Sequence, residues 1–271
     1  MSAPAATLAP PSPTVTRLAR PHVVGDALTI AWRNLLNIRR NPQLLVFATI
    51  QPVIFVLMFR YVFGGAIHVT GVSYVDYLMP GIFVQTVVFG SLTTGVGLAE
   101  DLQKGLVDRF RSLPMARSAV LVGRTLADLV RNVFVVILMC VVGLAVGWRP
   151  GGSLPEIVAG VGLVLGFAYS LSWLFAIVGL SARDSETAQA ASFPILAPLV
   201  FASSAFVPIS SMPGWLQVFA NHQPVSAIVN AVRALTLGGA AASQVFAALA
   251  WIVGIVAICA PIAVSRYRRA V

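Results

Sequence analysis

Three histidines, nine carboxylates and a single lysine are the side chains of this 271-residue chain that could perform acid–base, metal or phosphate chemistry. A metal centre or a nucleophilic triad brings several such groups together at characteristic spacings. His22, His68 and His222 are instead scattered over three polar segments, and no metal-ligand or triad spacing occurs. The sequence therefore predicts no catalytic residue and no metal site.

Residues that could couple the chain to an energy source are equally few. A phosphate-binding loop needs Gly-Lys followed by Ser or Thr, but Gly105 follows Lys104, the only lysine. The acidic residues fall in polar segments or at the ends of apolar runs, which counts against a proton relay. They are Asp26, Asp76, Glu100, Asp101, Asp108, Asp128, Glu156, Asp184 and Glu186. We therefore expect no cofactor on this chain.

The composition is that of a membrane protein, with 58% apolar and only 10% charged residues. A soluble domain carries about 25% charged residues because its surface must be wet. The apolar runs are continuous rather than alternating, which favours an all-α polytopic protein over a β-barrel. A net charge of +9 fits attraction to anionic membrane lipid better than binding of nucleic acid. Cys140 and Cys259 both lie in apolar runs, where a disulfide framework is not expected.

The apolar runs predict six transmembrane helices, each near the 20 residues or so that a span requires. Their ranges are about 43–64, 77–99, 120–147, 157–180, 188–209 and 243–264. With both termini cytoplasmic, the outer side holds only Arg60, Arg149 and Arg233 of the 18 basic residues. This positive-inside bias predicts cytoplasmic termini and an even number of spans.

The N-terminal region precedes the first span. Residues 1–22 are rich in Pro, Ala, Ser and Thr and are predicted to form a disordered cytoplasmic tail. Residues 23–41 are predicted to form an amphipathic helix at the inner membrane interface, with Trp32 at headgroup depth. Residues 42–271 then form one six-span domain. The helix has apolar residues at i, i+3, i+4 and i+7, namely Leu28, Ala31, Trp32 and Leu35.

The segment between the second and third predicted spans is charged, yet it keeps apolar residues at helical spacing. Gly105 breaks the helix before it, and Pro114 ends the helix after it. The pattern predicts a short cytoplasmic helix that docks a soluble partner, with an ordinary solvated loop as the alternative. Beyond it, Arg124, Asp128 and Arg131 share one helical face and can pair with one another, which predicts a salt-bridged helix foot or, alternatively, a gating element.

The segment at 209–242, between the fifth and sixth predicted spans, is longer than a simple connection. Pro213 and Pro224 can each open a helix, and Gly238 can end the second one. Trp215 is expected to anchor the segment at the outer interface. The pattern predicts two outer half-helices, which form either a lid over a membrane path or an ordinary capped loop.

Polar and aromatic side chains inside the predicted spans could line a route through the membrane. An exposed polar side chain is disfavoured in lipid, so these residues should face protein or a cavity. Interhelical hydrogen bonding is the alternative role. The residues proposed for the route are Gln51, Phe55, Gln85, Phe89, Phe201 and Ser204.

Together these segments resemble the type-2 permeases of ABC exporters, and within that family the daunorubicin-resistance branch of drug and lipid exporters. The resemblance covers nearly the whole chain. Its most specific parts are Glu100…Gly105…Arg109…Leu113-Pro114 and Phe206-Val207-Pro208…Met212-Pro213-Gly214-Trp215-Leu216…Gln223-Pro224…Arg233. The family usually has Asn before the second proline, where this chain has Gln223.

The resemblance implies roles for both motifs. The first would contact the ATPase through Glu100, Gly105, Leu106, Val107, Arg109, Phe110, Leu113 and Pro114. An outer gate would comprise Pro208, Met212, Pro213, Trp215, Pro224, Arg233 and Gly238. The implied partners are two copies of an ATP-binding subunit that carries ATP and Mg, a second permease that is identical or homologous, and membrane lipid, but no nucleic acid.

The resemblance also implies a function and a location. We expect a non-enzymatic, multi-pass subunit of the bacterial inner membrane. It would export amphipathic or lipid-like compounds such as drugs, polyketides or glycolipids. The alternatives are a proton-coupled secondary exporter and a polysaccharide exporter permease of the same type.

Overall fold

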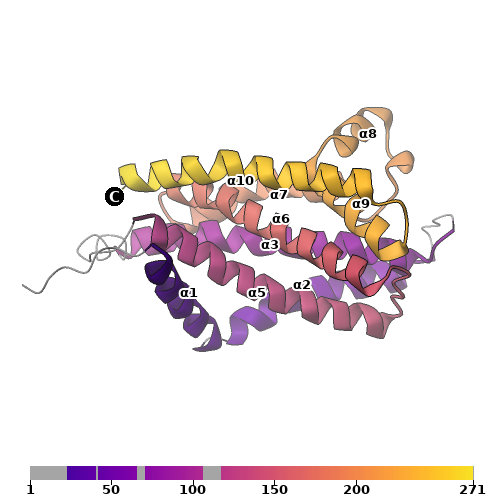
Figure 1. The fold of residues 1–271 in the computed structure, drawn as a ribbon, viewed down its shortest axis with the longest axis horizontal. Coiled ribbons are helices and arrows are strands. Elements are labelled where there is room, and N and C mark those ends of the chain that lie inside the picture. Colours follow the sequence, from indigo (N-terminus) through magenta and orange to yellow (C-terminus); the bar gives the residue numbers. More distant parts are fainter. Residues whose placement is uncertain (1–22, 41, 66–70, 106–116, 271) are drawn as a thin grey trace, which may run out of the picture.

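The computed structural model describes residues 23–40, 42–65, 71–105 and 117–270, and within these ranges it is all-helical. Figure 1 shows the described chain as an elongated helical bundle. A π-helical turn, η1 (Phe59–Phe63), and a 3₁₀ turn, η2 (Ile209–Ser211), accompany nine α-helices in the described residues. The α-helices are α1 (Val23–Arg40), α2 (Pro42–Met58), α3 (Tyr74–Gln103), α5 (Arg117–Val146), α6 (Leu154–Ser181), α7 (Ser185–Phe201), α8 (Gly214–Asn221), α9 (Pro224–Leu237) and α10 (Ala242–Ala270).

Four helices in the described ranges are long and apolar enough to cross a membrane. They are Tyr74–Gln103, Ala119–Val146, Leu154–Ser181 and Ala242–Arg269, and they coincide with the ranges predicted at 77–99, 120–147, 157–180 and 243–264. At 1.5 Å rise per residue, 28 residues extend about 42 Å, more than the roughly 30 Å hydrocarbon core. These helices run along the long axis of the molecule (Figure 1).

Each of the two other predicted spans contains an α-helix of only 17 residues. The first is α2, which contains Pro52 and continues through η1 to Phe63. The fifth is α7, which ends at Phe201 rather than near 209. Its last turn carries Pro198, whose carbonyl accepts from the Ala202 amide at 3.0 Å. In the turn that follows, Ser203 Oγ donates to the Val200 carbonyl at 2.6 Å and accepts from the Ala205 amide at 3.1 Å, which are local bonds of the kind that compete with a helical pattern.

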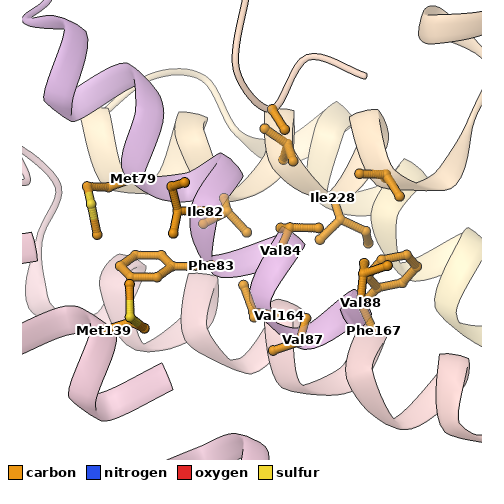
Figure 2. Close-up of a cluster of buried hydrophobic side chains, with 14 of the residues drawn as sticks. Met79, Ile82, Phe83, Val84, Val87, Val88, Met139, Val164, Phe167 and Ile228 are labelled. Atoms are coloured by element: carbon orange, nitrogen blue, oxygen red, sulfur yellow. The ribbon is translucent and has the colours of Figure 1, made fainter. Parts of the chain in front are cut away.

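Helix α3 is the centre of the bundle. Its buried side chains interdigitate with those of α5, α6 and α9, as Figure 2 shows. The residues labelled in that close-up are Met79, Ile82, Phe83, Val84, Val87 and Val88 of α3, Met139 of α5, Val164 and Phe167 of α6, and Ile228 of α9. Every one is 2% exposed or less, so α3 holds the other helices in fixed positions.

Two glycines allow α3 and α6 to touch backbone to backbone. A Cβ built on Gly179 would overlap the backbone of Gly95, and a Cβ built on Gly95 would lie 2.5 Å from the Phe175 carbonyl oxygen. Small residues at a crossing are the usual route to close helix packing in membranes, where no hydrophobic effect drives helices together.

Helix α1 lies across the start of α5, at the same end of the bundle as the end of α10, whereas α8 and α9 lie at the other end (Figure 1). Ala27 and Ile30 are buried, and a Cβ on Gly123 of α5 would lie 2.5 Å from the Ala27 carbonyl oxygen. Leu28 and Trp32 are 58% and 64% exposed. One face of the helix therefore packs on α5, and a second apolar face remains uncovered.

Candidate functional site

A cavity of about 150 Å³ lies between α2, α3 and α5. It sits near the middle of α3 and α5, the depth at which a spanning helix crosses the bilayer centre. The lining residues follow one another along each helix in steps of one or three, so they share one face of it. They are Ala48, Gln51 and Pro52 of α2, Gln85, Thr86, Phe89, Gly90 and Thr93 of α3, and Arg131, Asn132 and Val135 of α5.

Two amide side chains in this cavity have unused hydrogen-bonding atoms. Gln85 and Asn132 are both 2% exposed. Within the described part of the chain, neither Gln85 Oε1 nor Asn132 Nδ2 has a hydrogen-bond partner. The hydroxyls of Thr86 and Thr93 instead donate to carbonyls of their own helix at 2.7 and 2.8 Å. Both atoms are buried, so the walls of the cavity contain two polar groups whose hydrogen-bonding capacity is not satisfied within the described residues.

An ion pair closes the cavity on the side toward the start of α5. Arg131 lies 3.3 Å from Asp128, and its Nη2 donates to the Gly90 carbonyl at 2.6 Å. Arg131 Nη1 also donates to Thr93, while Thr94 of α3 donates to Asp128. The two charges compensate each other and bind α3 to α5, as buried charges in a membrane protein require.

The neighbouring charge on α5 has a different partner from the one predicted. Arg124 pairs with Asp101 at the end of α3, rather than with Asp128 four residues further along its own helix. The start of α5 is therefore salt-bridged, as predicted, but its partner lies on α3. One inter-helix ion pair, Asp101–Arg124, and the hydrogen bonds of Asp128 and Arg131 to α3 thus join α3 to α5.

The six residues predicted to line a route do not meet in one place. Gln51, Gln85 and Phe89 line the cavity. Phe55 and Phe201 belong instead to an aromatic cluster around Phe206, with ring centroids 6.3 and 5.8 Å from it. Phe59 of η1 stacks on Phe206 at 4.6 Å and 9°. Ser204 lies in a third environment, next to α9.

Arg233 joins α9 to the rest of the bundle at the end where α8 and α9 lie. Its guanidinium carbon lies 3.6 Å from the centroid of the Tyr77 ring. Its Nε donates to the Tyr77 carbonyl at 3.2 Å, its Nη2 to the Ser204 carbonyl at 2.7 Å, and its Nη1 to Asn230 Oδ1 at 3.2 Å. No carboxylate of the described residues lies within ion-pair distance of it. The cation is therefore held by carbonyls and an aromatic face.

A polar face of α9 continues this network along the turn that follows α7. Ser226 Oγ accepts from the Ser204 amide at 3.1 Å, and Ser204 Oγ donates to Asn230 Oδ1 at 2.8 Å. Gln223, the residue that departs from the family pattern, donates to the Ala202 carbonyl at 2.7 Å. No role was predicted from the sequence for Ser226 and Asn230. Their spacing of four residues on a largely apolar helix nevertheless indicates a polar face.

The remaining residues of the predicted gate lie around α8 and at the ends of α9. Helix α9 begins at Pro224 and ends at Gly238, which has φ +75° and ψ 33°. Trp215 of α8 is 75% exposed, as an interfacial anchor would be. The preceding η2 turn lies between Pro208 and Met212, and Pro213 stands just before α8. The two short helices form the end of the bundle opposite α1 (Figure 1).

The predicted ATPase contact is described only at its start. Glu100 and Lys104 form an i,i+4 ion pair at 2.5 Å, which raises the pKa of Lys104. Gly105 has φ +65°, a conformation that ends α3 and that glycine adopts without strain. The predicted contact residues Leu106, Val107, Arg109, Phe110, Leu113 and Pro114 lie outside the described residues.

The chain belongs to the ABC-2 type transporter family, whose model matches residues 26–237. It is therefore a permease, the non-catalytic, multi-pass membrane component of an ABC transporter, and family membership implies an ATP-binding subunit as partner. Among named proteins, the daunorubicin resistance ABC transporter permease protein DrrB1 of Streptomyces coeruleorubidus is 36% identical over 93% of this chain and 89% of its own length. The probable doxorubicin resistance ABC transporter permease protein DrrC of Mycobacterium tuberculosis (strain ATCC 25618 / H37Rv) is 30% identical over 91% and 90%.

Similarity extends to more distant permeases. The putative transport permease ycf38 of Porphyra purpurea is 24% identical over 78% of this chain and 74% of its own length. The predicted resemblance to type-2 ABC permeases is thus confirmed.

Proposed function

We propose that this chain is the permease of an ATP-driven exporter that moves amphipathic, drug-like or lipid-like compounds out of the cytoplasm or inner leaflet of a bacterial plasma membrane. The observation that carries the proposal is the match to two drug-resistance permeases over about nine-tenths of both chains. A cavity at mid-membrane depth with unsatisfied polar atoms supports a transport role.

We propose six spans with both termini in the cytoplasm. Helix α2 with η1 would be the first, and α7 the fifth. The 17 residues of α7 extend about 26 Å, slightly less than the hydrocarbon core, which a membrane accommodates at modest cost. Helices α8 and α9 would then complete the outer part of that region, and α1 would lie on the inner interface.

Two copies of an ATP-binding subunit and a second permease, identical or homologous, would complete the exporter. ATP and Mg would bind to the ATP-binding subunits. Closure of those subunits would push on residues 100–114. The Asp101–Arg124 pair and the hydrogen bonds of Asp128 and Arg131 to α3 would make α3 and α5 respond together. Only a difference in interaction energy between the two states can drive the movement.

The outer end would be closed by α8 and α9 while the path is open to the cytoplasmic side. Arg233 and the polar face of α9 hold this end against α3 and the turn after α7. In this proposal the outer half-helices are a gate, and breaking their bonds opens it.

Transport in inside-out vesicles tests the proposal. Vesicles that contain the permease and its ATP-binding subunit should accumulate daunorubicin when ATP is added, and a phosphate-loop lysine substitution in the ATP-binding subunit should abolish this. Uptake that needs no ATP and disappears with a proton uncoupler would establish the secondary-exporter alternative instead. Uptake of polysaccharide without drug uptake would establish the polysaccharide alternative.

A further inference from the structure

Helix α10 lies along one side of the bundle and is the least covered of the four long apolar helices (Figure 1). Only 11% of its apolar stretch is buried, whereas 67% of that of α3 is buried. The helix packs mainly on α6 and α9. Most of its surface is therefore available to the acyl chains of the membrane.

The last turns of α10 have a clear inward face. Cys259, Ala263 and Tyr267 are 8%, 0% and 2% exposed. They pack with buried side chains of α1, α3, α5 and α6 in one cluster. This face fixes the rotation of the helix about its own axis, so the direction of the other side chains follows from their position in the sequence.

A stripe of apolar side chains on the uncovered part of α10 ends in two arginines. At 3.6 residues per turn, Ile258, Ile262, Arg266 and Arg269 lie within about 80° of one another around the helix. Ile258 and Ile262 are 63% and 40% exposed, and both arginines are exposed. The stripe therefore presents an apolar surface and a positive charge side by side.

The length of the stripe matches one leaflet of a bilayer. Arg266 follows Ile258 by eight residues, which is about 12 Å along a helix. Half of the hydrocarbon core is about 15 Å thick. When Arg266 lies at the level of the lipid headgroups, Ile258 and Ile262 lie beside acyl chains of the same leaflet, so one phospholipid can contact all of them.

The Arg266 side chain is positioned by the neighbouring helix. Its Nη1 donates to Ser181 Oγ at the end of α6, and the Ser181 hydroxyl donates to the Ile177 carbonyl at 2.7 Å. A guanidinium has five N–H donors, so this bond leaves most of them available. Orientation by the positive-inside rule needs only charge on one side of the membrane and does not account for this fixed position.

No protein carboxylate neutralises these arginines in the described residues. The ion pairs of the described chain involve Lys104, Arg124 and Arg131, and none involves the end of α10. Asp184, the carboxylate nearest to Ser181 in the sequence, accepts from the Thr187 amide at 2.7 Å as the cap of α7. The end of α10 is therefore a positive site with room for an anion.

A phosphate that carries no cation of its own suits this site. A guanidinium binds phosphate through paired N–H donors, and basic sites between membrane helices on the cytoplasmic side bind anionic lipid headgroups. Phosphatidylcholine brings an ammonium group beside its phosphate, whereas phosphatidylglycerol does not. The second lipid therefore gains more from two arginines.

Resting on the cytoplasmic location of the α10 end proposed above, we propose that Arg266 and Arg269 bind the phosphate of an anionic phospholipid of the inner leaflet. The acyl chains of this lipid lie along Ile258 and Ile262. The bond from Arg266 to Ser181 positions the guanidinium for the contact.

Lipid binding to the permease with its ATP-binding subunit, purified in detergent and freed of lipid, tests the proposal. Dioleoyl phosphatidylglycerol is compared with dioleoyl phosphatidylcholine, which has the same acyl chains. Stabilisation against heat at increasing lipid concentration gives each affinity. The anionic lipid should bind roughly 25-fold more tightly, from about fivefold per arginine, which is equivalent to about 1 kcal/mol each.

Substitutions of exposed residues isolate the site. Arg266→Gln and Arg269→Gln should each reduce the preference for phosphatidylglycerol roughly fivefold, and the double variant should abolish it. Arg268→Gln is the matched control, because it removes the same charge from the last turn of α10 but lies about 160° from Arg266 around the helix. It should change the preference less than twofold. Ser181→Ala keeps every charge and should lower the preference roughly twofold by releasing Arg266.

Four results would overturn the proposal. An equal loss in Arg268→Gln would show a diffuse surface charge, and an unchanged preference in the double variant would show that the two arginines bind no lipid. Glycerophosphoglycerol, the same headgroup without acyl chains, should bind at least tenfold more weakly, and equal binding would make this a site for soluble phosphates. Loss of the ATP-binding subunit from a double variant that keeps its lipid preference would assign the arginines to that subunit.

Three further results separate this inference from the proposed function. ATP-driven daunorubicin uptake by a protein without lipid preference would keep the exporter and reject the site. A preference that depends on Arg266 and Arg269, in protein without ATP-driven uptake, would keep the site and reject the export function. Labelling of Ser265→Cys by an impermeant thiol reagent outside intact cells, in a chain without Cys140 and Cys259, would overturn the assignment to the inner leaflet.

Discussion

Replacing Arg233 with Met should release the outer end of α9. The substitution keeps most of the apolar length of the side chain but removes three directed hydrogen bonds and the contact with the Tyr77 ring. A hydrogen bond to a charged group contributes roughly 1.5–3 kcal/mol, and a cation–π contact about 0.5–2 kcal/mol.

These contributions do not add fully, because they belong to one cluster. The Ser204 carbonyl also keeps the bond that the Tyr77 hydroxyl donates to it at 3.2 Å. We therefore expect a loss of about 3 kcal/mol in the docking of α9, which raises the population of the opened outer end roughly 100-fold. Arg233→Lys retains the charge but not the fork geometry of the guanidinium. The population of the opened end in this variant should lie between those of the unchanged protein and of Arg233→Met.

Thiol accessibility measures this opening. A single cysteine replaces Ser226, which is fully buried, in a chain whose Cys140 and Cys259 are changed to Ala. A membrane-impermeant reagent added outside should label it up to roughly 100-fold faster when Arg233 is Met, if labelling follows local opening. Arg149→Met is the control, since Arg149 bonds the Leu144 and Trp148 carbonyls. An unchanged labelling rate in correctly inserted Arg233→Met protein would refute the role of Arg233.

Three further predictions concern other parts of the chain. Gly179→Ala should destabilise the purified permease by more than 1 kcal/mol, measured by thermal denaturation, because α6 must move off α3, whereas Gly254→Ala, with open space around it, should not. The Thr187 amide donates to the Asp184 carboxylate at 2.7 Å and thereby lowers the pKa of Asp184. This N-terminal cap of α7 should therefore persist at pH values above the ordinary pKa of 3.8 and be lost as the pH falls through the lowered pKa. Hydrogen exchange at the start of α7 should show that loss, and the same acid dependence in Asp184→Asn would contradict the prediction. Phe110→Asp should reduce co-purification of the ATP-binding subunit, because a charge would enter an apolar docking cleft, and undiminished co-purification of inserted protein would exclude that contact.

The long helices could be predicted because each rests on a continuous apolar run, a local property of the sequence. The end of α7 could not. Pro194 and Pro198 occur inside the helix, where neighbouring helices in a membrane protein tolerate them. The helix ends at Phe201, just before a turn in which the Ala205 amide donates to Ser203 Oγ. Nothing in the apolar pattern marks that bond.

The polar contacts were predictable in kind but not in partner. Arg124 and Asp128 have the spacing of a helical ion pair, yet packing of α3 on α5 gives Arg124 a carboxylate 23 residues away. Arg233 reaches a carbonyl 156 residues distant in sequence. For the same reason Gln51 and Gln85 meet at one cavity while Phe55 does not, since helix rotation about its axis, not residue type, decides which neighbours a side chain faces.

The buried pair of Asp128 and Arg131 has a consequence for biogenesis. A charged side chain near the centre of a newly inserted helix costs about 2.5–3.5 kcal/mol, so α5 is a poor candidate to enter the bilayer alone. The Gly90 carbonyl accepts from Arg131, and the Thr94 hydroxyl donates to Asp128. Both groups lie on α3, which leaves the ribosome earlier than α5. Synthesis thus delivers the partner before the charges that need it, and α5 should leave the translocon against α3 rather than into free lipid.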